Sequence, residues 1–450
     1  METGTLQAAV RELMPTARAD LEALVRIPSV AFPGFPPAPV QEAARVVVAL
    51  LIDAGVTNAR LVEIPGGYPA VVGDIAAPPG RPTILLYAHY DVQPAGPDAA
   101  WTTPPFEPAV RGGRMYGRGA ADDKSGIVSH ATAVRAFGGR PPVGVKLVIE
   151  GEEETASHLP RYVREHSEFF QADAIIVGDA GNMSPGVPTL TTALRGVASC
   201  TVEVRTLAGP VHSGQFGGPA PDALMALIRM LATLQDERGN PAVAGLASGQ
   251  WTSGAEPPED LFRRTSGLLD GVALIGDGSL ADRLWAKPSV NVIGIDAPAV
   301  DGAANALVPV ARARVSLRVA PGDDATVALR RLQDHLRSVA PWNVQVRVFD
   351  GQFGAGYSAP TGGPVYAAAV RAMEAAFGRQ VIMGGAGGSI PLVNVLAAVA
   401  PEAEIVIWGA EDSESTIHAP NESVDLADFE RMIQAEALLF EALGNGAPAS

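Results

Sequence analysis

The sequence predicts an α/β fold in which a mostly parallel sheet, flanked by helices, is interrupted by a second domain of ferredoxin-like α+β type. Strands and helices alternate over the first part of the chain, which is typical of a parallel sheet. After Arg195-Gly196 the order becomes β-α-β-β-α-β, which is typical of a ferredoxin-like unit. Beyond a Gly/Pro-rich loop over 351–364 the first pattern returns. The predicted boundaries are 1–196 and 356–450 for a discontinuous first domain, and 197–355 for the inserted domain.

Periodicity and turn residues define the elements of the first segment. Apolar residues at helical spacing predict helices over 6–25 and 40–54, and prolines enforce a loop between them. Short β-type runs bounded by glycines and prolines predict strands. The remaining predicted elements are strands over 60–64, 70–75, 83–88, 145–149 and 174–177, and helices over 127–137 and 158–167.

The same signals continue through the rest of the chain. The inserted domain is predicted to contain strands over 198–205, 290–295, 311–319 and 344–349, and helices over 220–234 and 326–339. The last segment is predicted to contain helices over 365–377, after Ser389 and over 424–443, and strands over 380–383 and 404–408.

Composition restricts the class of protein. The 450 residues are 47% hydrophobic, enough for two or three domains with substantial cores. The net charge of -16 argues against nucleic acid as a partner, because no basic run can neutralise phosphates. The single cysteine, Cys200, fits a reducing compartment, and no stretch is apolar enough to span a membrane. We therefore expect a cytoplasmic protein that binds neither nucleic acid nor membranes.

The strand over 83–88 leads into His89-Tyr-Asp91, which can orient a metal ligand. Residues two apart on a strand point to the same side of a sheet. The carboxylate of Asp91 can accept a hydrogen bond from one imidazole nitrogen of His89, which leaves the other nitrogen free for a metal. A surface His-x-Asp at a strand end is the alternative.

Other acidic residues follow predicted strands. Glu153 and Glu154 come after the strand over 145–149, and Asp179 follows the strand over 174–177. Functional groups of open α/β sheets gather at the carboxyl ends of the strands. Adjacent carboxylates suit metal-assisted hydrolysis, since one can bind an ion while its neighbour takes a proton from water. A solvated acidic turn is the alternative for Glu153 and Glu154.

Two further residues complete a candidate metal site. Asp122 lies in a glycine-rich stretch before a predicted helix, where a helix N-cap is the alternative role. His418 lies in the motif His-Ala-Pro-Asn-Glu of the last segment. Nitrogen and oxygen ligands of this kind suit two divalent ions with one bridging carboxylate. The candidate ligand set is His89, Asp122, Glu154, Asp179 and His418.

Taken in order, these motifs closely resemble the M20 family of metallopeptidases, in its dipeptidase branch related to carnosinases. The resemblance implies that His89, Glu154, Asp179 and His418 are metal ligands and that Asp122 is the bridging carboxylate, commonly followed by a cis peptide bond to Asp123. It also implies that Asp91 braces His89 and that Glu153 is the general base. Ser125 and Ala156 stand where many relatives have glycine, which concerns substrate preference and not metal binding.

The resemblance extends into the inserted domain. The motif around His212-Ser-Gly resembles a lid motif whose histidine stabilises the tetrahedral oxyanion in the active site of the partner subunit, which implies a homodimer through this domain. Asn305 and Arg318 resemble lid residues that contact substrate, and Arg318 can clamp a carboxylate. The loop with Gly387, Gly388 and Ser389 resembles the substrate-carboxylate loop of the family.

The sequence therefore predicts two-metal-dependent hydrolysis of dipeptides or very short peptides, by metal-activated water with Glu153 as general base. Zinc is the expected ion, and manganese or cobalt also fits. An N-acyl amino acid deacylase on the same fold is the alternative enzyme, although such relatives usually lack this form of the His212 motif. A non-catalytic peptide- or metal-binding protein is the alternative from another class, but it could dispense with Glu153, which is not a ligand.

Overall fold

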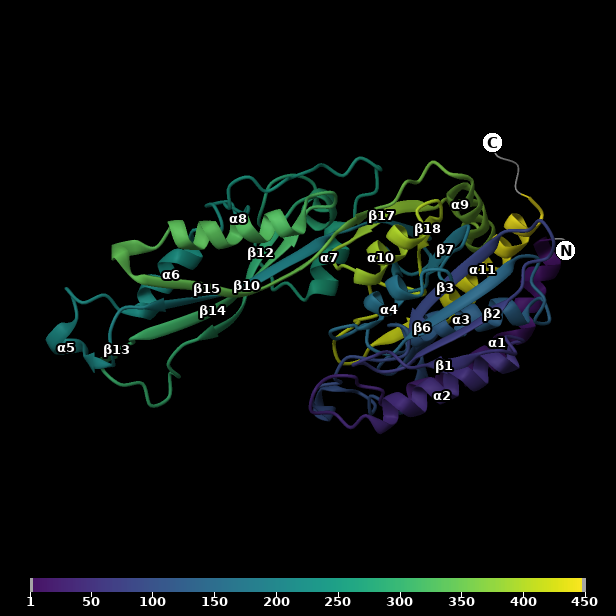
Figure 1. Cartoon of the computed structure of the whole chain (residues 1–450), viewed down its shortest axis with the longest axis horizontal. Coiled ribbons are helices and arrows are strands. Elements are labelled where there is room, and N and C mark those ends of the chain that lie inside the picture. Colours follow the sequence, from purple (N-terminus) through teal and green to yellow (C-terminus); the bar gives the residue numbers. More distant parts are fainter. Residues whose placement is uncertain (1–2, 447–450) are drawn as a thin grey trace.

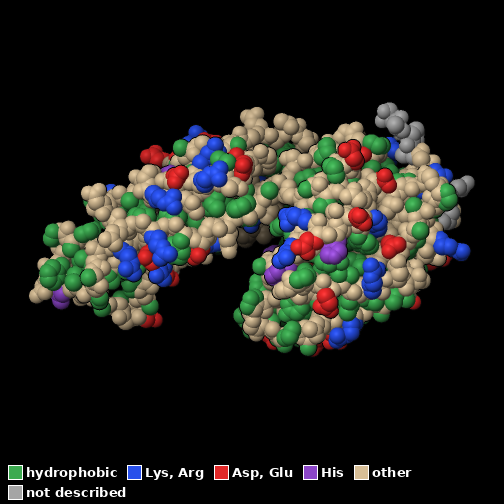
Figure 2. All heavy atoms as spheres, viewed as in Figure 1, with side chains coloured by type: hydrophobic (Ala, Val, Ile, Leu, Met, Phe, Trp, Pro, Cys, Tyr) green, Lys and Arg blue, Asp and Glu red, His purple; other side chains and the backbone are tan. Residues whose placement is uncertain are grey.

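The computed structural model describes residues 3–446 and divides into two lobes. Figure 1 shows a larger lobe that carries both ends of the chain and a smaller, elongated lobe that is reached through long strands. Figure 2 shows a concave gap between the lobes, with histidine and acidic side chains on the part of the larger lobe that borders it. No helix in the described range is long and apolar enough to cross a membrane.

A nine-stranded sheet forms the centre of the larger lobe, and its middle strands are parallel. Its main path is β1-β2-β6-β3-β7-β18-β9-β16, and β17 pairs with β9. Strands β6, β3, β7 and β18 are mutually parallel, whereas the pairings of β1 with β2, of β2 with β6, and of β9 with β18 and β16 are antiparallel. The strands are β1 (Arg60–Val62), β2 (Ala70–Ile75), β3 (Thr83–His89), β6 (Gly144–Glu150), β7 (Ala174–Val177), β9 (Thr189–Leu194), β16 (Tyr357–Ser358), β17 (Ile382–Ala386) and β18 (Glu404–Ile407).

Helices cover both faces of this sheet. Alternate residues of β3 enter two cores: Ile84 and Leu86 enter one, and Leu85 and Tyr87 enter the other. A strand that is buried on both faces needs a continuous apolar sequence, which is what β3 has. The first core is closed by α1 (Thr3–Val25), α2 (Ala38–Asp53), α3 (Lys124–Arg135), α9 (Pro364–Phe377) and α11 (Leu426–Gly444), and the second by α4 (Leu159–Glu165) and α10 (Pro391–Val399).

The smaller lobe has the strand order expected of a ferredoxin-like unit. Its antiparallel sheet runs β12-β14-β10-β15, and α6 and α8 pack on one face. At the far end of this lobe a two-stranded ribbon, β11 with β13, and the short helix α5 form a tip (Figure 1). The elements are β10 (Gly196–Arg205), β11 (Val211–His212), α5 (Ser213–Phe216), α6 (Ala223–Ala232), α7 (Glu259–Ser266), β12 (Ser289–Asp296), β13 (Ala306–Leu307), β14 (Val310–Val319), α8 (Ala325–Ser338) and β15 (Gln345–Gly354).

Two small sheets attach the end of the chain to the carboxyl edge of the large sheet. In one, β20 pairs with β5, which pairs with β4. In the other, β19 pairs in parallel with β8. These pairings bring the His418 segment beside the loops that follow β5 and β7. The strands of these two sheets are β4 (Ala109–Arg111), β5 (Arg114–Tyr116), β8 (Gly181–Asn182), β19 (Glu411–Asp412) and β20 (Ser423–Asp425). Elsewhere in the chain lie the 3₁₀ turns η1 (Asp98–Ala100) and η3 (Pro341–Asn343) and the π-helical turn η2 (Asp282–Ala286).

Candidate metal centre and active site

The last residue of β3, His89, marks the centre of the candidate site. Its Nε2 atom lies 3.0 Å from Oδ1 of Asp122 and 3.8 Å from Oδ1 of Asp179. Asp179 follows β7, whose carboxyl end lies beside that of its parallel neighbour β3. Asp122 comes from the loop after β5 (Arg114–Tyr116). His89, Asp123 and Asp179 form one group whose ligand atoms lie within 4.8 Å of one another.

Asp122 connects this group to a second one. Its Oδ1 atom faces His89, while its Oδ2 atom lies 2.9 Å from Nε2 of His418. Burial acts to raise the pKa of Asp122, but the hydrogen bond with His418 and the nearby imidazole of His89 outweigh it and hold that pKa well below its usual range. Because its two oxygens face two different histidines, Asp122 has the geometry of a bridging carboxylate.

The second group consists of Asp122, Glu154 and His418. Glu154 Oε2 lies 3.2 Å from Nε2 of His418 and accepts a hydrogen bond of 2.7 Å from Gln93. The hydrogen bonds with Asp122 and Glu154 raise the pKa of His418 to about 10, against the effect of burial. Sequence reasoning did not single out Gln93, which follows β3 by four residues.

The loop that carries Asp122 is held by a buried glutamate from the end of the chain. Glu422 accepts hydrogen bonds from the backbone amides of Gly119, Ala121 and Asp122 at 3.0 to 3.1 Å. It also forms an ion pair of 2.6 Å with Arg118. The Asp122–Asp123 peptide bond is cis, as the resemblance implies. Helix α3 begins at Lys124 with Asp123 as its N-cap, so Asp122 is not the cap.

Asp91 contacts both His89 and the loop of Glu153 and Glu154. The Nδ1 atom of His89 lies 3.1 Å from the backbone oxygen of Asp91 and 3.5 Å from its carboxylate. The carboxylate instead accepts hydrogen bonds from the amides of Glu153 and Glu154, at 3.0 and 3.1 Å. Strand β3 ends at His89, so Asp91 turns out of the sheet and reaches the glutamate loop.

Glu153 lies beside the ligand groups without belonging to them. It lines a hollow of about 270 Å³ together with Tyr87, Ala156 and Leu392. Burial, followed by the negative charge of Asp179, raises the pKa of Glu153 well above its ordinary value. A glutamate with this placement can accept a proton from a molecule held between the two groups.

The donor atoms of these two groups fit divalent ions. The Nε2 atom of His89 is fully buried and has no hydrogen-bond partner of acceptable geometry, and neither has Oδ1 of Asp123. Buried polar atoms in native structures have partners, so both atoms point to a ligand. Imidazole nitrogen with carboxylate oxygen is a set that zinc, manganese and cobalt accept.

The inserted-lobe residues form a separate cluster at the tip. His212 and Asn305 are neighbours there, since Asn305 accepts a backbone hydrogen bond of 3.0 Å from Ser213. His212 is exposed, and its Nδ1 accepts a hydrogen bond from the amide of Gly214 at 3.0 Å. The tip lies at the opposite end of the molecule from the large sheet (Figure 1), so within one chain neither residue joins the metal groups.

The junction of the lobes holds two arginines without an acidic partner. Arg318 on β14 makes no ion pair or side-chain hydrogen bond within the described residues, whereas its neighbours Arg312 and Arg314 on the same strand are paired. Arg195, which is 8% exposed, lies against Gly387, where an added Cβ would be 3.0 Å from its guanidinium. Burial, followed by the charge of Arg318, lowers the pKa of Arg195 to about 10. Sequence reasoning missed Arg195.

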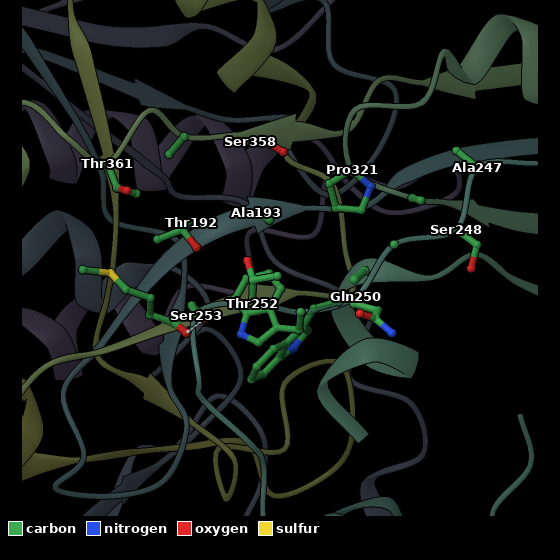
Figure 3. A pocket seen from close by; sticks show the side chains of 17 residues that line it. Thr192, Ala193, Ala247, Ser248, Gln250, Thr252, Ser253, Pro321, Ser358 and Thr361 are labelled. Carbon is green, nitrogen blue, oxygen red and sulfur yellow. Dashed lines mark hydrogen bonds between the residues drawn. The ribbon is translucent and has the colours of Figure 1, made fainter. Parts of the chain in front are cut away.

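Another hollow lies at the junction, away from the metal groups. Figure 3 shows a pocket of about 460 Å³ lined by small hydroxyl side chains such as Thr192, Ser253 and Ser358, and by two tryptophans, Trp251 and Trp285. None of its lining residues is ionisable or belongs to the metal groups. It has no acid, base or ligand for hydrolysis, so the chemistry belongs to the cluster around His89.

Comparison with known proteins decides the family. Residues 85–442 match the model described as "Peptidase family M20/M25/M40", and this range contains every residue of the metal groups. The chain belongs to this peptidase family. The resemblance inferred from the motifs and the predicted enzyme class are thereby confirmed, and use of divalent metal is a property of the family.

Curated relatives of this M20 peptidase match over most of its length. It is 38% identical over 409 residues to a cysteinylglycine-S-conjugate dipeptidase of Corynebacterium striatum, covering 88% of this chain and 89% of the relative. It is 27% identical over 401 residues to a Beta-Ala-His dipeptidase of Mus musculus, covering 83% of this chain and 81% of the relative.

Solved structures share the fold of this M20 peptidase. The dipeptidase Dug1p of Saccharomyces cerevisiae superposes with a TM-score of 0.86 at 22% identity, covering 99% of both chains. Human carnosine dipeptidase 1 superposes with a TM-score of 0.83 at 23% identity, again covering 99% of both chains. The predicted α/β fold with an inserted domain is therefore confirmed.

Proposed function

We propose that this M20 peptidase hydrolyses dipeptides or very short peptides with two divalent ions. The observation that carries the proposal is the position of Asp122, whose two oxygens face two separate groups of ligand atoms. The relatives named above are dipeptidases, and Glu153 lies beside both groups without being a ligand of either. The proposed ligands are His89, Asp122, Glu154, Asp179 and His418.

The residues of the chain divide the chemistry among them. Divalent ions held by these ligands would polarise the scissile carbonyl and lower the pKa of water. Glu153 takes the proton of the attacking water and returns it to the leaving amine. Asp91 positions Glu153 and Glu154 through their backbone amides. Glu422 fixes the backbone of Asp122.

Zinc is the ion we propose, with manganese and cobalt as the other ions that the ligand set accepts. One nitrogen from each histidine and several carboxylate oxygens are available in the two groups. We also propose a cytoplasmic location, which the single, buried Cys200 supports because such a protein needs no disulfide.

The free carboxylate of the substrate is proposed to lie at the junction of the lobes. Arg318, Gly387, Gly388 and Ser389 are the residues expected from the sequence, and Arg195 joins them. Two guanidinium groups close together without an acidic partner favour an anion between or beside them. A clamp of this kind selects peptides with a free carboxyl terminus.

We further propose a homodimer through the inserted domain, which we place at 197–355. Its edge strand β12 exposes Val292, Ile293 and Ile295 at 43%, 63% and 47%, and α6 exposes Met225 at 56%. An edge strand has unpaired backbone groups that a second copy can pair with. In such a dimer the tip with His212 and Asn305 would reach the site of the partner, where His212 stabilises the oxyanion.

A substrate panel on metal-reconstituted protein tests the proposed function. Metal-depleted protein is reloaded with zinc, manganese or cobalt and assayed on dipeptides such as Cys-Gly and β-Ala-His, on their carboxyl-terminal amides, and on N-acetyl amino acids. We expect the free dipeptides to be hydrolysed, the amides to react at least about 10-fold more slowly for lack of the charge-assisted contacts, and chelator to abolish activity. Faster hydrolysis of the N-acetyl amino acids would make the chain a deacylase.

A further inference from the structure

Glu411 is a buried residue beside Asp122 and Asp179. Neither the sequence motifs nor the proposed mechanism gives Glu411 a role. It lies on β19, which pairs with β8 through Glu411 and Gly181. A Cβ at Gly181 would lie 2.8 Å from the Cβ of Glu411, so the glycine lets these two segments approach closely. The pairing places Glu411 next to the segment that begins with Asp179.

The carboxylate of Glu411 faces other carboxylates. Glu411 is 9% exposed, and its ligand atom lies within 4.8 Å of those of Asp122 and Asp179. Across residues 3–446, no side chain or backbone amide donates a hydrogen bond to it. The adjacent Asp412 is different, because Arg114 donates to both of its oxygens at 2.9 and 3.2 Å.

A buried carboxylate among like charges destabilises a fold unless a cation or a hydrogen-bond donor compensates it. Two further atoms of the same cluster point to a cation. They are Nε2 of His89 and Oδ1 of Asp123, both buried and without a hydrogen-bond partner. Around His89, the described residues therefore leave atoms of His89, Asp123 and Glu411 without a hydrogen-bond partner.

We propose that Glu411 is a further ligand of the divalent ion held by His89, Asp122 and Asp179, an inference that rests on the proposed two-ion function. The two ion sites are then unequal. The first is buried and rich in carboxylates, while the second includes His418, whose side chain is 50% exposed. The first ion is accordingly the one held more tightly.

The variant Glu411→Gln tests this inference, with Glu414→Gln as control because Glu414 is exposed in the same segment. Bound zinc is measured by elemental analysis and calorimetric titration. The melting temperature Tm is measured with and without zinc. For Glu411→Gln we expect a higher Tm than the parent without zinc, because a buried like charge is removed. With zinc we expect affinity at the tighter site to fall by about 100-fold, and the zinc-induced rise in Tm to shrink. The control should match the parent in all of these measurements.

The two proposals fail in different ways. If the parent itself binds no zinc, the two-ion function fails and this inference fails with it. If the parent binds two ions and Glu411→Gln binds both with unchanged affinity, only this inference is overturned. A lower Tm of Glu411→Gln without zinc would assign Glu411 a structural role instead. Should Glu411→Gln not fold, Glu411→Asp keeps the charge but shortens the reach, and it should fold and bind zinc more weakly.

Discussion

At the scale of single residues, Asp91 separates the roles of two adjacent glutamates. Its carboxylate accepts the backbone amides of both Glu153 and Glu154, so the turn between them is fixed. With the backbone held, the side chain of Glu154 reaches the group of Asp122 and His418, and that of Glu153 lines the neighbouring hollow. Two identical side chains thereby take different positions through a third residue.

The variant Glu153→Gln keeps the shape of the side chain but removes its basic oxygen. We expect turnover to fall by about 100-fold or more, because general-base catalysis contributes this much, while metal content stays at the parental value. Activity on a dipeptide and bound metal are measured on the same preparation. Glu154→Gln is the matched control and should lose metal, since Glu154 lies in a ligand group. Loss of metal from Glu153→Gln would show that the two glutamates have been assigned the wrong way round.

At the scale of elements, α3 and α11 position the site from behind the sheet. Every residue of α3 up to Val134 is buried. The Nδ1 atom of its His130 lies 2.8 Å from Oε1 of Glu436 on α11, and the Nε2 atom lies 3.0 Å from the backbone oxygen of Tyr87 on β3. One histidine thus joins two helices to the strand that ends in His89.

This contact predicts a stability that depends on pH. Burial alone would lower the pKa of His130, but the charge and hydrogen bond of Glu436 outweigh it, and the pKa is raised from 6.5. The stabilisation is therefore complete below the unfolded pKa and is lost as pH rises through the folded pKa. Glu436→Gln leaves a buried imidazolium unpaired, so we expect a loss of about 3 to 5 kcal/mol in unfolding free energy at acid pH.

Denaturant unfolding at several pH values between 5 and 9 checks this expectation. The difference between the parent and Glu436→Gln should be largest at the acid end and shrink as pH rises. Glu165→Gln is the control, because its ion pair with Arg161 is exposed on α4 and should add nothing measurable. A difference that stays constant over this range would contradict a charged His130.

Elements with clear boundaries in the sequence were predicted closely. Strands β2 and β7 fall on their predicted ranges, since turn residues flank both runs. Strand β9 was missed because its threonine-rich sequence lacks an apolar pattern. Helix α7 was missed because it is short, polar and enclosed in a Gly/Pro-rich stretch. The antiparallel edges of the large sheet were also not foreseen, because pairing direction depends on partners far away in the chain.

The residues of the candidate site were likewise predicted where the local sequence marks them and missed where contacts with distant residues decide. Residues at strand ends, such as His89 and Asp179, were singled out because parallel strands end at one edge of a sheet. Glu422, Arg195 and Glu411 were not, because their importance depends on what they meet. Glu422, for example, accepts the amide of Asp122 across 300 positions of sequence. No local pattern reports such a contact.

At the scale of the whole molecule, the proposed role of His212 requires a second subunit, because the tip lies at the opposite end of the molecule from the large sheet (Figure 1). If His212 acts in the partner's site, two inactive variants complement each other. Mixing His212→Ala with Glu153→Gln should give about a quarter of parental activity, because half of the molecules are heterodimers with one competent site of two. Activity is measured after subunit exchange has been verified by mass spectrometry. No recovery would mean that His212 acts within its own chain or has no part in catalysis.

The pairing of Asp122 with His418 spans 296 positions, with the whole smaller lobe between them. Chains grow on the ribosome from the amino terminus, so the second ligand group stays incomplete until the inserted lobe and most of the final segment have been made. Hydrolytic competence is therefore acquired only after the inserted lobe has been made. A chain that stops after the smaller lobe lacks His418, Glu422 and Glu411 together, so it cannot assemble the proposed two-ion site.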